Sequence, residues 1–446
     1  MATYSYDERC LVEAGSVKTP WFSLYSFAIV KSHRLNLSHI KLFGHTKLIG
    51  MAQLYEVEGR LMELNKAFSD IQKDLVHISE KLYDHPELGN EEYRSMEVLV
   101  DYLKRHQFDV ETGLVDVPTS FRAEFTSEKP GPTVAYLAEY DALPGIGHGC
   151  GHNLIAATSV GAGIALSKMI EDVGGKVVIL GTPAEETNGA KVPMAAQGVF
   201  DDIDVAMMAH PGGVSEESGA TLAIDAIQFA FTGKTSHASA APEEGINALD
   251  GVIQLFNGIN ALREHVPSDV RMHGIISQGG EAANVVPGYA VAQFYFRAET
   301  RSTLDDIVKK VKKIAEGASA ISGATVEISN YELSNDNLVT NQHLSERFID
   351  NLKAITDESI EPAGKAGGSS DIGNVSHVVP AIHPHIGMND ASLIAHTKRF
   401  ADTTVTQDGR DFIKKGVLSL AQTGWDVLSD PDLLESIQTE FQHANK

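Results

Sequence analysis

The stretch Thr133–Asn153 reads TVAYLAEYDALPGIGHGCGHN; it begins as an apolar strand and ends in a glycine-rich segment. That segment holds one thiol and two imidazoles, with only glycines between them. Glycine lets the backbone turn sharply and approach a ligand closely. We expect Cys150 and His152 at a strand end or in a loop, where side chains two positions apart can converge on one ion. Cysteine with histidine suits Zn²⁺ or a similar metal. A structural turn with a buried cysteine and histidine is the alternative.

The charge and cysteine content of the chain exclude several classes of protein. Its 446 residues suffice for one to three domains. The formal net charge of -24 argues against nucleic acid or an anionic membrane as a partner, because both bind basic surfaces. Two cysteines, Cys10 and Cys150, exclude a disulfide framework and fit a reducing compartment. No apolar run is long enough to span a bilayer, so we expect a cytoplasmic protein.

The first 50 residues differ from the remainder in charge. They contain six Lys or Arg and three Asp or Glu, whereas the rest of the chain is strongly acidic. We interpret residues 1–50 as a poorly ordered extension that precedes a strongly patterned helix. The three acidic residues count against a targeting segment, and an upstream misplaced start at Met1 is the simpler explanation.

Apolar strands that alternate with helices predict a mostly parallel sheet. The clearest strands are residues 121–126, 133–139, 176–180, 205–209 and 381–386, and the clearest helices are residues 52–84, 91–106, 154–170, 344–355 and 408–428. Three strands run out into acids or histidines: first Asp141 with Cys150 and His152, then Glu185 with Glu186, then His210. Ligands of such folds collect beyond the carboxyl ends of the strands, so we expect these groups to converge.

From about residue 222 the pattern changes to β-α-β-β-α-β, the order of a ferredoxin-like unit. We therefore predict an α/β fold, in which helices flank a mostly parallel mixed sheet and an α+β ferredoxin-like domain is inserted. The expected boundaries are 51–222 with 335–446 for the first domain and 223–334 for the inserted one.

The adjacent acids Glu185 and Glu186 follow a buried strand and a Thr-Pro turn. Neighbouring carboxylates point in different directions, so one can bind a metal while the other takes a proton from water. A solvated acidic loop is the alternative. Taken alone, His210 could be a core histidine and His396 a surface histidine.

Seven motifs, together with His396, resemble the aminoacylase and carboxypeptidase group of metallopeptidase family M20. The motifs are HPELG at 85–89, DALP at 141–144, HGCGHN at 148–153, PAEE at 183–186, AHP at 209–211, GKTSHA at 233–238 and ANVVP at 283–287. They occur in the order typical of the family. HGCGHNL and the stretch GSSDIGNVSH at 368–377 are similar to one branch, that of the Xaa-Arg dipeptidases and the aminobenzoyl-glutamate hydrolases.

The resemblance implies a zinc-exopeptidase-like catalytic domain, and a dimerisation or lid role for the inserted domain. It implies two divalent metal ions, Zn²⁺ or Mn²⁺, on the ligands Cys150, His152, Glu186, His210 and His396. Cys150 stands where other branches place a bridging carboxylate.

The resemblance also assigns catalytic and substrate-binding positions. Glu185 matches the general base, and His237 matches a histidine that reaches the active site of a partner subunit. Asn284 and Arg297 match residues that hold the substrate carboxylate. Glu139 departs from the Asp-x-Asp pair common in the related amidohydrolases, and like His148, His383 and His385 it receives no role.

These parts predict a homodimer that hydrolyses an amide bond in dipeptides or N-acyl amino acids with a free carboxylate, by metal-activated water and a Glu base. Aminobenzoyl-glutamate-like conjugates are the alternative substrates. The alternative function is that of a non-catalytic homologue that binds an amino-acid conjugate or a partner. The charge of the leaving residue stays open. A serine hydrolase is disfavoured because the chain has no Gly-x-Ser-x-Gly elbow.

Overall fold

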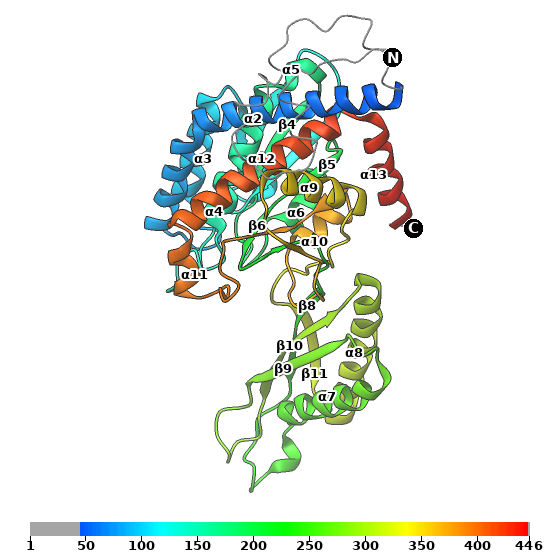
Figure 1. Cartoon of the computed structure of the whole chain (residues 1–446). Coiled ribbons are helices and arrows are strands. Elements are labelled where there is room, and N and C mark those ends of the chain that lie inside the picture. The colour runs from blue at the N-terminus through cyan, green and yellow to red at the C-terminus, as the bar shows by residue number, and fades with distance from the viewer. Residues whose placement is uncertain (1–44, 445–446) are drawn as a thin grey trace, which may run out of the picture. The chain divides into compact units, whose positions relative to one another are not determined.

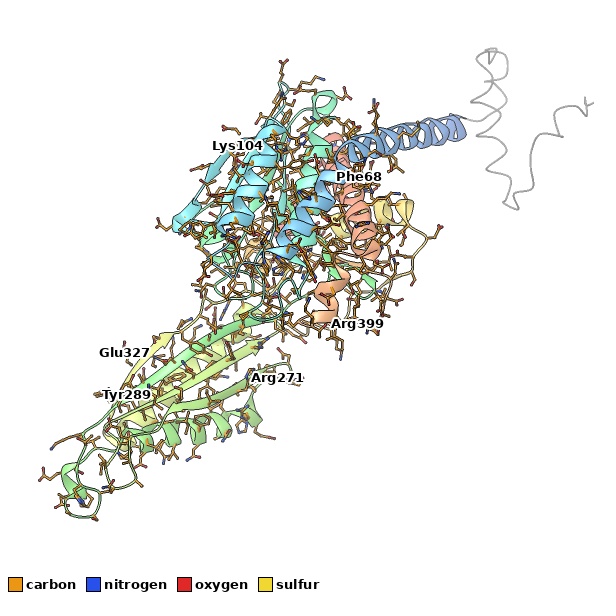
Figure 2. All side chains as sticks on the ribbon, turned by 90° about the vertical axis from the view of Figure 1, so that its left-hand side faces the viewer. Phe68, Lys104, Arg271, Tyr289, Glu327 and Arg399 are labelled. Carbon is orange, nitrogen blue, oxygen red and sulfur yellow. The ribbon has the colours of Figure 1, made fainter. Side chains whose placement is uncertain are left out.

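The computed structural model describes residues 45–444 of the chain (Figure 1). Most of the predicted extension, residues 1–50, lies outside the described residues. The chain divides into two units, residues 1–60 and 61–446, and the second contains everything that follows. Helix α2 (His45–Asp84) runs into this second unit. Its predicted apolar spacing is confirmed, because Phe68, Leu75 and Leu82 are all buried (Figure 2 labels Phe68).

A six-stranded sheet of order β1-β2-β4-β3-β5-β13 lies at the centre of the main domain. Its strands are β1 (Asp109–Thr112), β2 (Phe121–Thr126), β3 (Thr133–Ala138), β4 (Lys176–Gly181), β5 (Val205–Met207) and β13 (Ala381–Ile382). The pairs β3–β4, β3–β5 and β5–β13 are parallel, whereas β1–β2 and β2–β4 are antiparallel. The predicted mostly parallel sheet is confirmed. Strand β1 was not predicted, because its residues are mainly exposed and carry no apolar pattern.

Helices cover this sheet. They are α3 (Tyr93–Arg105), α4 (His152–Ser167), α5 (Ile170–Val173), α6 (Lys191–Ala196), α9 (Gln342–Ile355), α10 (Ile372–Ser376), α11 (Lys398–Thr403), α12 (Gln407–Ser429) and α13 (Pro431–Ala444). Helix α4 is buried along its whole length and packs on β3 and α12 (Figure 1). Its small residues allow this contact: a Cβ at Gly161 would lie 2.5 Å from Leu75 and 2.7 Å from Val417. None of the helices in residues 45–444 is long and apolar enough to cross a membrane.

A second sheet of short strands adjoins the ends of the central strands, in the order β12-β7-β14-β6. It contains β6 (His210–Gly212), β7 (Ser215–Glu216), β12 (Ile360–Glu361) and β14 (His385–Gly387). The strand predicted at 381–386 is therefore two strands in two sheets. The break falls at His383-Pro384, because proline has no N–H with which to continue a ladder. This arrangement pairs His385 with His210.

The inserted segment forms a four-stranded antiparallel sheet with its own hydrophobic core, in the order β11-β8-β10-β9. It contains β8 (Ala223–Thr232), α7 (Ala248–Leu262), β9 (Arg271–Gln278), β10 (Tyr289–Ala298), α8 (Arg301–Ser322) and β11 (Thr325–Asn330). Helices α7 and α8 pack on β8 and β10 (Figure 1). The chain order confirms the predicted ferredoxin-like unit. Figure 2 labels Arg271 on β9, the strand at one edge of this sheet, where it pairs with β10.

Candidate metal centre

Side chains that can bind a metal meet beyond the ends of the central strands. The loop after β3 carries Cys150, the turn after β4 carries Glu185 and Glu186, β6 begins with His210, and His396 precedes α11. All five line one pocket of about 410 Å³. The convergence expected from the strand ends is therefore present, although the residues are up to 246 positions apart in the chain (Cys150 to His396, 396 - 150).

The candidate ligand atoms form two groups that share the Cys150 thiol. One group is Cys150, His152 and His210, and the other is Cys150, Glu186 and His396. Within each group the ligand atoms lie within 4.8 Å of one another. Two groups with one residue in common suit a pair of neighbouring cations with a bridging ligand.

The separations of these atoms fit ligands on common ions. Cys150 Sγ lies 3.5 Å from His210 Nε2. Zinc bonds of about 2.3 Å to sulfur and about 2.0 Å to nitrogen place two such ligands about 3.5 Å apart at a tetrahedral ion. His396 Nε2 lies 3.2 Å from Glu186 Oε1, compared with about 3.3 Å for nitrogen and oxygen ligands at such an ion. Glu186 Oε1 and His152 Nε2 are buried without a hydrogen-bond partner, as atoms that face a cation would be.

Burial sets the protonation of two of these ligands. Burial raises the pKa of the Cys150 thiol to about 12. Burial, with the neighbouring His385 and His383, holds the pKa of His210 well below its usual value. His210 is therefore neutral, which is the form that binds a metal. A cation must displace the proton of Cys150, so its affinity should rise with pH.

Asp141 holds two of the candidate ligands in place. Its Oδ1 lies 2.9 Å from His152 Nδ1, and its Oδ2 accepts a hydrogen bond of 2.9 Å from the backbone N–H of Glu186. Burial opposes ionisation of this carboxyl, but the charge of His152 and these hydrogen bonds keep its pKa below the usual range. An Nδ1–H bond to a carboxylate leaves Nε2 free for a metal. Sequence reasoning did not assign this role, although the DALP motif contains the residue.

The backbone on either side of the site explains its local sequence. Gly151 has φ of 79° and caps α4, and a Cβ there would lie 2.5 Å from Pro211 Cγ. Only glycine fits such a position. Helix α4 starts at His152, so this ligand lies in the first turn of a helix and not in a loop or at a strand end as predicted. The apolar residues that follow Gly151 explain the difference, because they extend the helix back to the cap.

The turn that carries the two acids is strained and supported from behind. Ala184 has φ of 64°, a left-handed conformation that costs about 1–2 kcal/mol for a residue with a Cβ. The buried carboxylate of Glu92 accepts hydrogen bonds from Ala184 N (2.8 Å) and Thr119 Oγ1 (2.9 Å). Burial raises the pKa of Glu92 to about 7.

Glu185 lies between the candidate ligands and a buried acidic group. Its carboxylate belongs to one group with His152 and Glu186 and to another with Glu139 and Asp371. Burial and the charges of Glu139 and Asp371 raise its pKa well above the ordinary value. Strongly perturbed acids in a pocket are typical of catalytic bases.

Lys191, Glu139 and Asp371 form a buried ionic cluster that sequence analysis did not find. Lys191 Nζ lies 2.6 Å from Glu139 Oε1 and 2.6 Å from Asp371 Oδ1. Only the position of Glu139 at the end of an apolar strand could have indicated it, since a lone lysine reads as a surface residue.

The remaining histidines differ in their surroundings. The rings of His383 and His385 pack against His210, with centroids 5.3 Å and 5.1 Å away. His148 is buried, its Nε2 lies 3.2 Å from the carbonyl oxygen of Leu82, and burial lowers its pKa to about 3. His148 therefore joins the central loop to α2.

The inserted domain carries three further predicted residues, and none belongs to the metal-ligand groups of the described residues. His237 and Asn284 are exposed neighbours: Asn284 O accepts a hydrogen bond from Ala238 N, and His237 pairs with Val285. Arg297 Nη1 lies 3.4 Å from Ser369 Oγ, in the loop that lines the pocket. Their predicted roles stay predictions.

Comparisons with known proteins agree with this site. Residues 221–321 match the family model of the peptidase dimerisation domain. Human Xaa-Arg dipeptidase is 34% identical over 411 residues, which cover 86% of this chain and 93% of that protein. The chain belongs to peptidase family M20. A p-aminobenzoyl-glutamate hydrolase protein from Escherichia coli is 36% identical over 271 residues, or 56% of either chain.

Solved structures of M20 proteins share the fold. The aminobenzoyl-glutamate utilization protein of Klebsiella pneumoniae has a TM-score of 0.68 at 19% identity, covering 82% of this chain and 99% of that chain. A Bacillus subtilis protein, described as a dinuclear metal binding peptidase from the M20 family, has a TM-score of 0.60 at 19% identity and covers 79% and 99%. The chain is a hydrolase of the M20 family, so the predicted family and enzyme class are confirmed.

Proposed function

We propose that this M20 hydrolase is a dinuclear metal-dependent dipeptidase that prefers a basic leaving residue. The observation that carries the proposal is the pair of ligand groups that share Cys150. The proposed ligands are Cys150, His152, Glu186, His210 and His396, and the proposed ions are Zn²⁺ or Mn²⁺. When bound, such cations activate water and polarise the scissile carbonyl.

The residues around the ions would supply the acid–base chemistry and bind the substrate. Glu185 takes the proton of the attacking water and passes it to the leaving amine. His237 of a partner subunit donates a hydrogen bond to the oxyanion, a contact worth about 3 kcal/mol in comparable sites. Asn284 and Arg297 hold the substrate carboxylate. The contact of Arg297 with Ser369 supports a place for its guanidinium near the pocket.

The charge of the pocket favours a basic substrate. Glu216 and Glu217 line the same pocket as Glu185, and among the described residues that line it Lys365 is the one lysine or arginine. An arginine or lysine side chain of the leaving residue would neutralise the two acids, whereas a glutamate would be repelled. The human relative is named for arginine and the E. coli relative for a glutamate conjugate. The acidic wall favours the first.

We also propose a homodimer formed through the inserted domain, with boundaries of 223–334 for that domain and 51–222 with 335–446 for the catalytic one. The edge strand β9 supports this, because it carries the exposed side chains of Ile275 (62%) and Ile276 (44%). An exposed apolar edge strand is a template for pairing with another chain.

The test of substrate class is a panel of Ala-Arg, Ala-Leu and Ala-Glu, assayed with protein loaded with Zn²⁺ or Mn²⁺. We expect the highest kcat/KM for Ala-Arg, and Glu217→Lys should lower that value at least tenfold while it leaves Ala-Leu within threefold. Equal kcat/KM for the three dipeptides, or a preference for Ala-Glu that survives the charge reversal, would contradict the proposed substrate class.

A further inference from the structure

The ammonium of Lys191 is entirely enclosed, at the first residue of α6. Its two partners, Glu139 and Asp371, are 1% and 0% exposed. Asp371 is held twice, because its Oδ2 also accepts a hydrogen bond of 3.1 Å from the backbone N–H of Lys191. Buried charges of this kind persist only where they are paired. The site already described gives Lys191 no function.

The two partners of Lys191 lead to different parts of the pocket. Glu139 ends the central strand, and its second oxygen, Oε2, lies 3.4 Å from His152 Nε2, the nitrogen that faces the proposed metal. Asp371 directly follows the loop 364–370, most of whose residues line the pocket. It also packs on the turn of the two acids, since a Cβ at Gly189 would lie 2.7 Å from Asp371 Cβ. Lys191 thus links the strand end to the loop.

We propose that Lys191 is a positioning residue of the metal centre. Its ammonium fixes Glu139 beside the metal-facing nitrogen of His152 and, through Asp371, ties the pocket loop to the same centre. The inference rests on the proposed metal site. It deepens that proposal by naming the cluster that holds the ligands and the substrate loop in register.

The arrangement of charges argues for a fixed ammonium rather than a further metal. Oxygens of Glu139, Glu185 and Asp371 lie within 4.8 Å of one another, which is a grouping that could hold a cation. The ammonium of Lys191 already contacts two of the three acids at 2.6 Å. It therefore occupies the place of a cation there and limits the repulsion that Glu185 receives from its neighbours.

The first test is the isosteric variant Glu139→Gln, which leaves Lys191 paired with Asp371. The second is the neutral triple variant Lys191→Met, Glu139→Gln and Asp371→Asn, which removes all three charges together. Replacing a whole buried ionic group is tolerated far better than removing one member. A matched control removes the partly buried pair Arg301 and Asp225 of the inserted domain, as Arg301→Met with Asp225→Asn.

The readout is the dissociation constant of Zn²⁺, measured by competition with a chromophoric chelator on protein whose folding is verified by circular dichroism. Loss of an outer contact of a metal ligand weakens binding about 10- to 100-fold. We expect at least a tenfold weakening in Glu139→Gln and in the triple variant, and none in the control.

At saturating metal, kcat should also fall at least tenfold in the triple variant, because the loop is released from the centre. A folded triple variant with affinity and kcat within twofold of wild type would overturn the role of Lys191. If the wild-type protein itself binds no metal, the proposed function fails instead, so the two failures are distinguishable.

Discussion

Asp141→Asn offers a quantitative test of how the site is held together. The carboxylate accepts two bonds, one from His152 Nδ1–H and one from Glu186 N–H, each 2.9 Å long. The amide of asparagine has one oxygen and one NH₂ group, so it can accept only one of the two bonds. Whichever way the amide is turned, the other donor faces an N–H.

The expected loss follows from the charge of the bond. A hydrogen bond to a charged group contributes about 1.5–3 kcal/mol, and an unsatisfied buried donor costs a similar amount. If this loss falls on the bound state, metal affinity drops about 10- to 150-fold, since each 1.4 kcal/mol is about tenfold. The dissociation constant of Zn²⁺ for Asp141→Asn, obtained by chelator competition, measures this drop directly.

The control is Asp109→Asn, at an exposed position of β1, for which the affinity should not change. Metal affinity within twofold of wild type in a folded Asp141→Asn variant would refute the reasoning, since it would mean that neither His152 nor Glu186 depends on this carboxylate for its orientation.

Three further predictions concern the base, the buried acid and the dimer. Glu185→Gln should lower kcat at least 100-fold with unchanged metal content, as expected for loss of a general base; elemental analysis beside the dipeptide assay checks both. The folded state binds the proton of Glu92 more tightly than the unfolded state, because its pKa is raised from 4.5 to about 7. The stability of wild type relative to Glu92→Gln should therefore fall by about 3 kcal/mol as pH rises from about 4.5 to about 7; urea unfolding at pH 4.5 and 8 would reveal a flat difference if this is wrong. Ile275→Lys with Ile276→Lys should convert a dimer to a monomer in light scattering and abolish activity if His237 acts in the partner's site; an active monomer would contradict that role.

The sequence predicted the fold and the candidate site where the signal was local. Apolar strands that end in acids or histidines predicted which side chains would meet, because the carboxyl ends of parallel strands share one edge of a sheet. The order of elements from β8 to β11 was sufficient for the ferredoxin-like unit. Both kinds of inference depend on patterns a few residues long.

The sequence could not predict what depends on long-range packing. Lys191 reaches Glu139 and Asp371 across 52 and 180 positions, and nothing near it in the chain indicates burial. The division of residues 381–387 between two sheets depends on neighbours that the segment meets only after folding. The first turn of α4 was placed too late because the capping role of Gly151 is visible only in its φ.

The central claim is that two cations share Cys150 between two groups of ligands. Anomalous diffraction from crystals grown with Zn²⁺ or Mn²⁺ tests it most directly. The account predicts two peaks per protomer, about 3.5–4 Å apart as in other two-metal sites, with Cys150 Sγ in contact with both. A single peak, or two peaks of which neither lies beside Cys150, would contradict it.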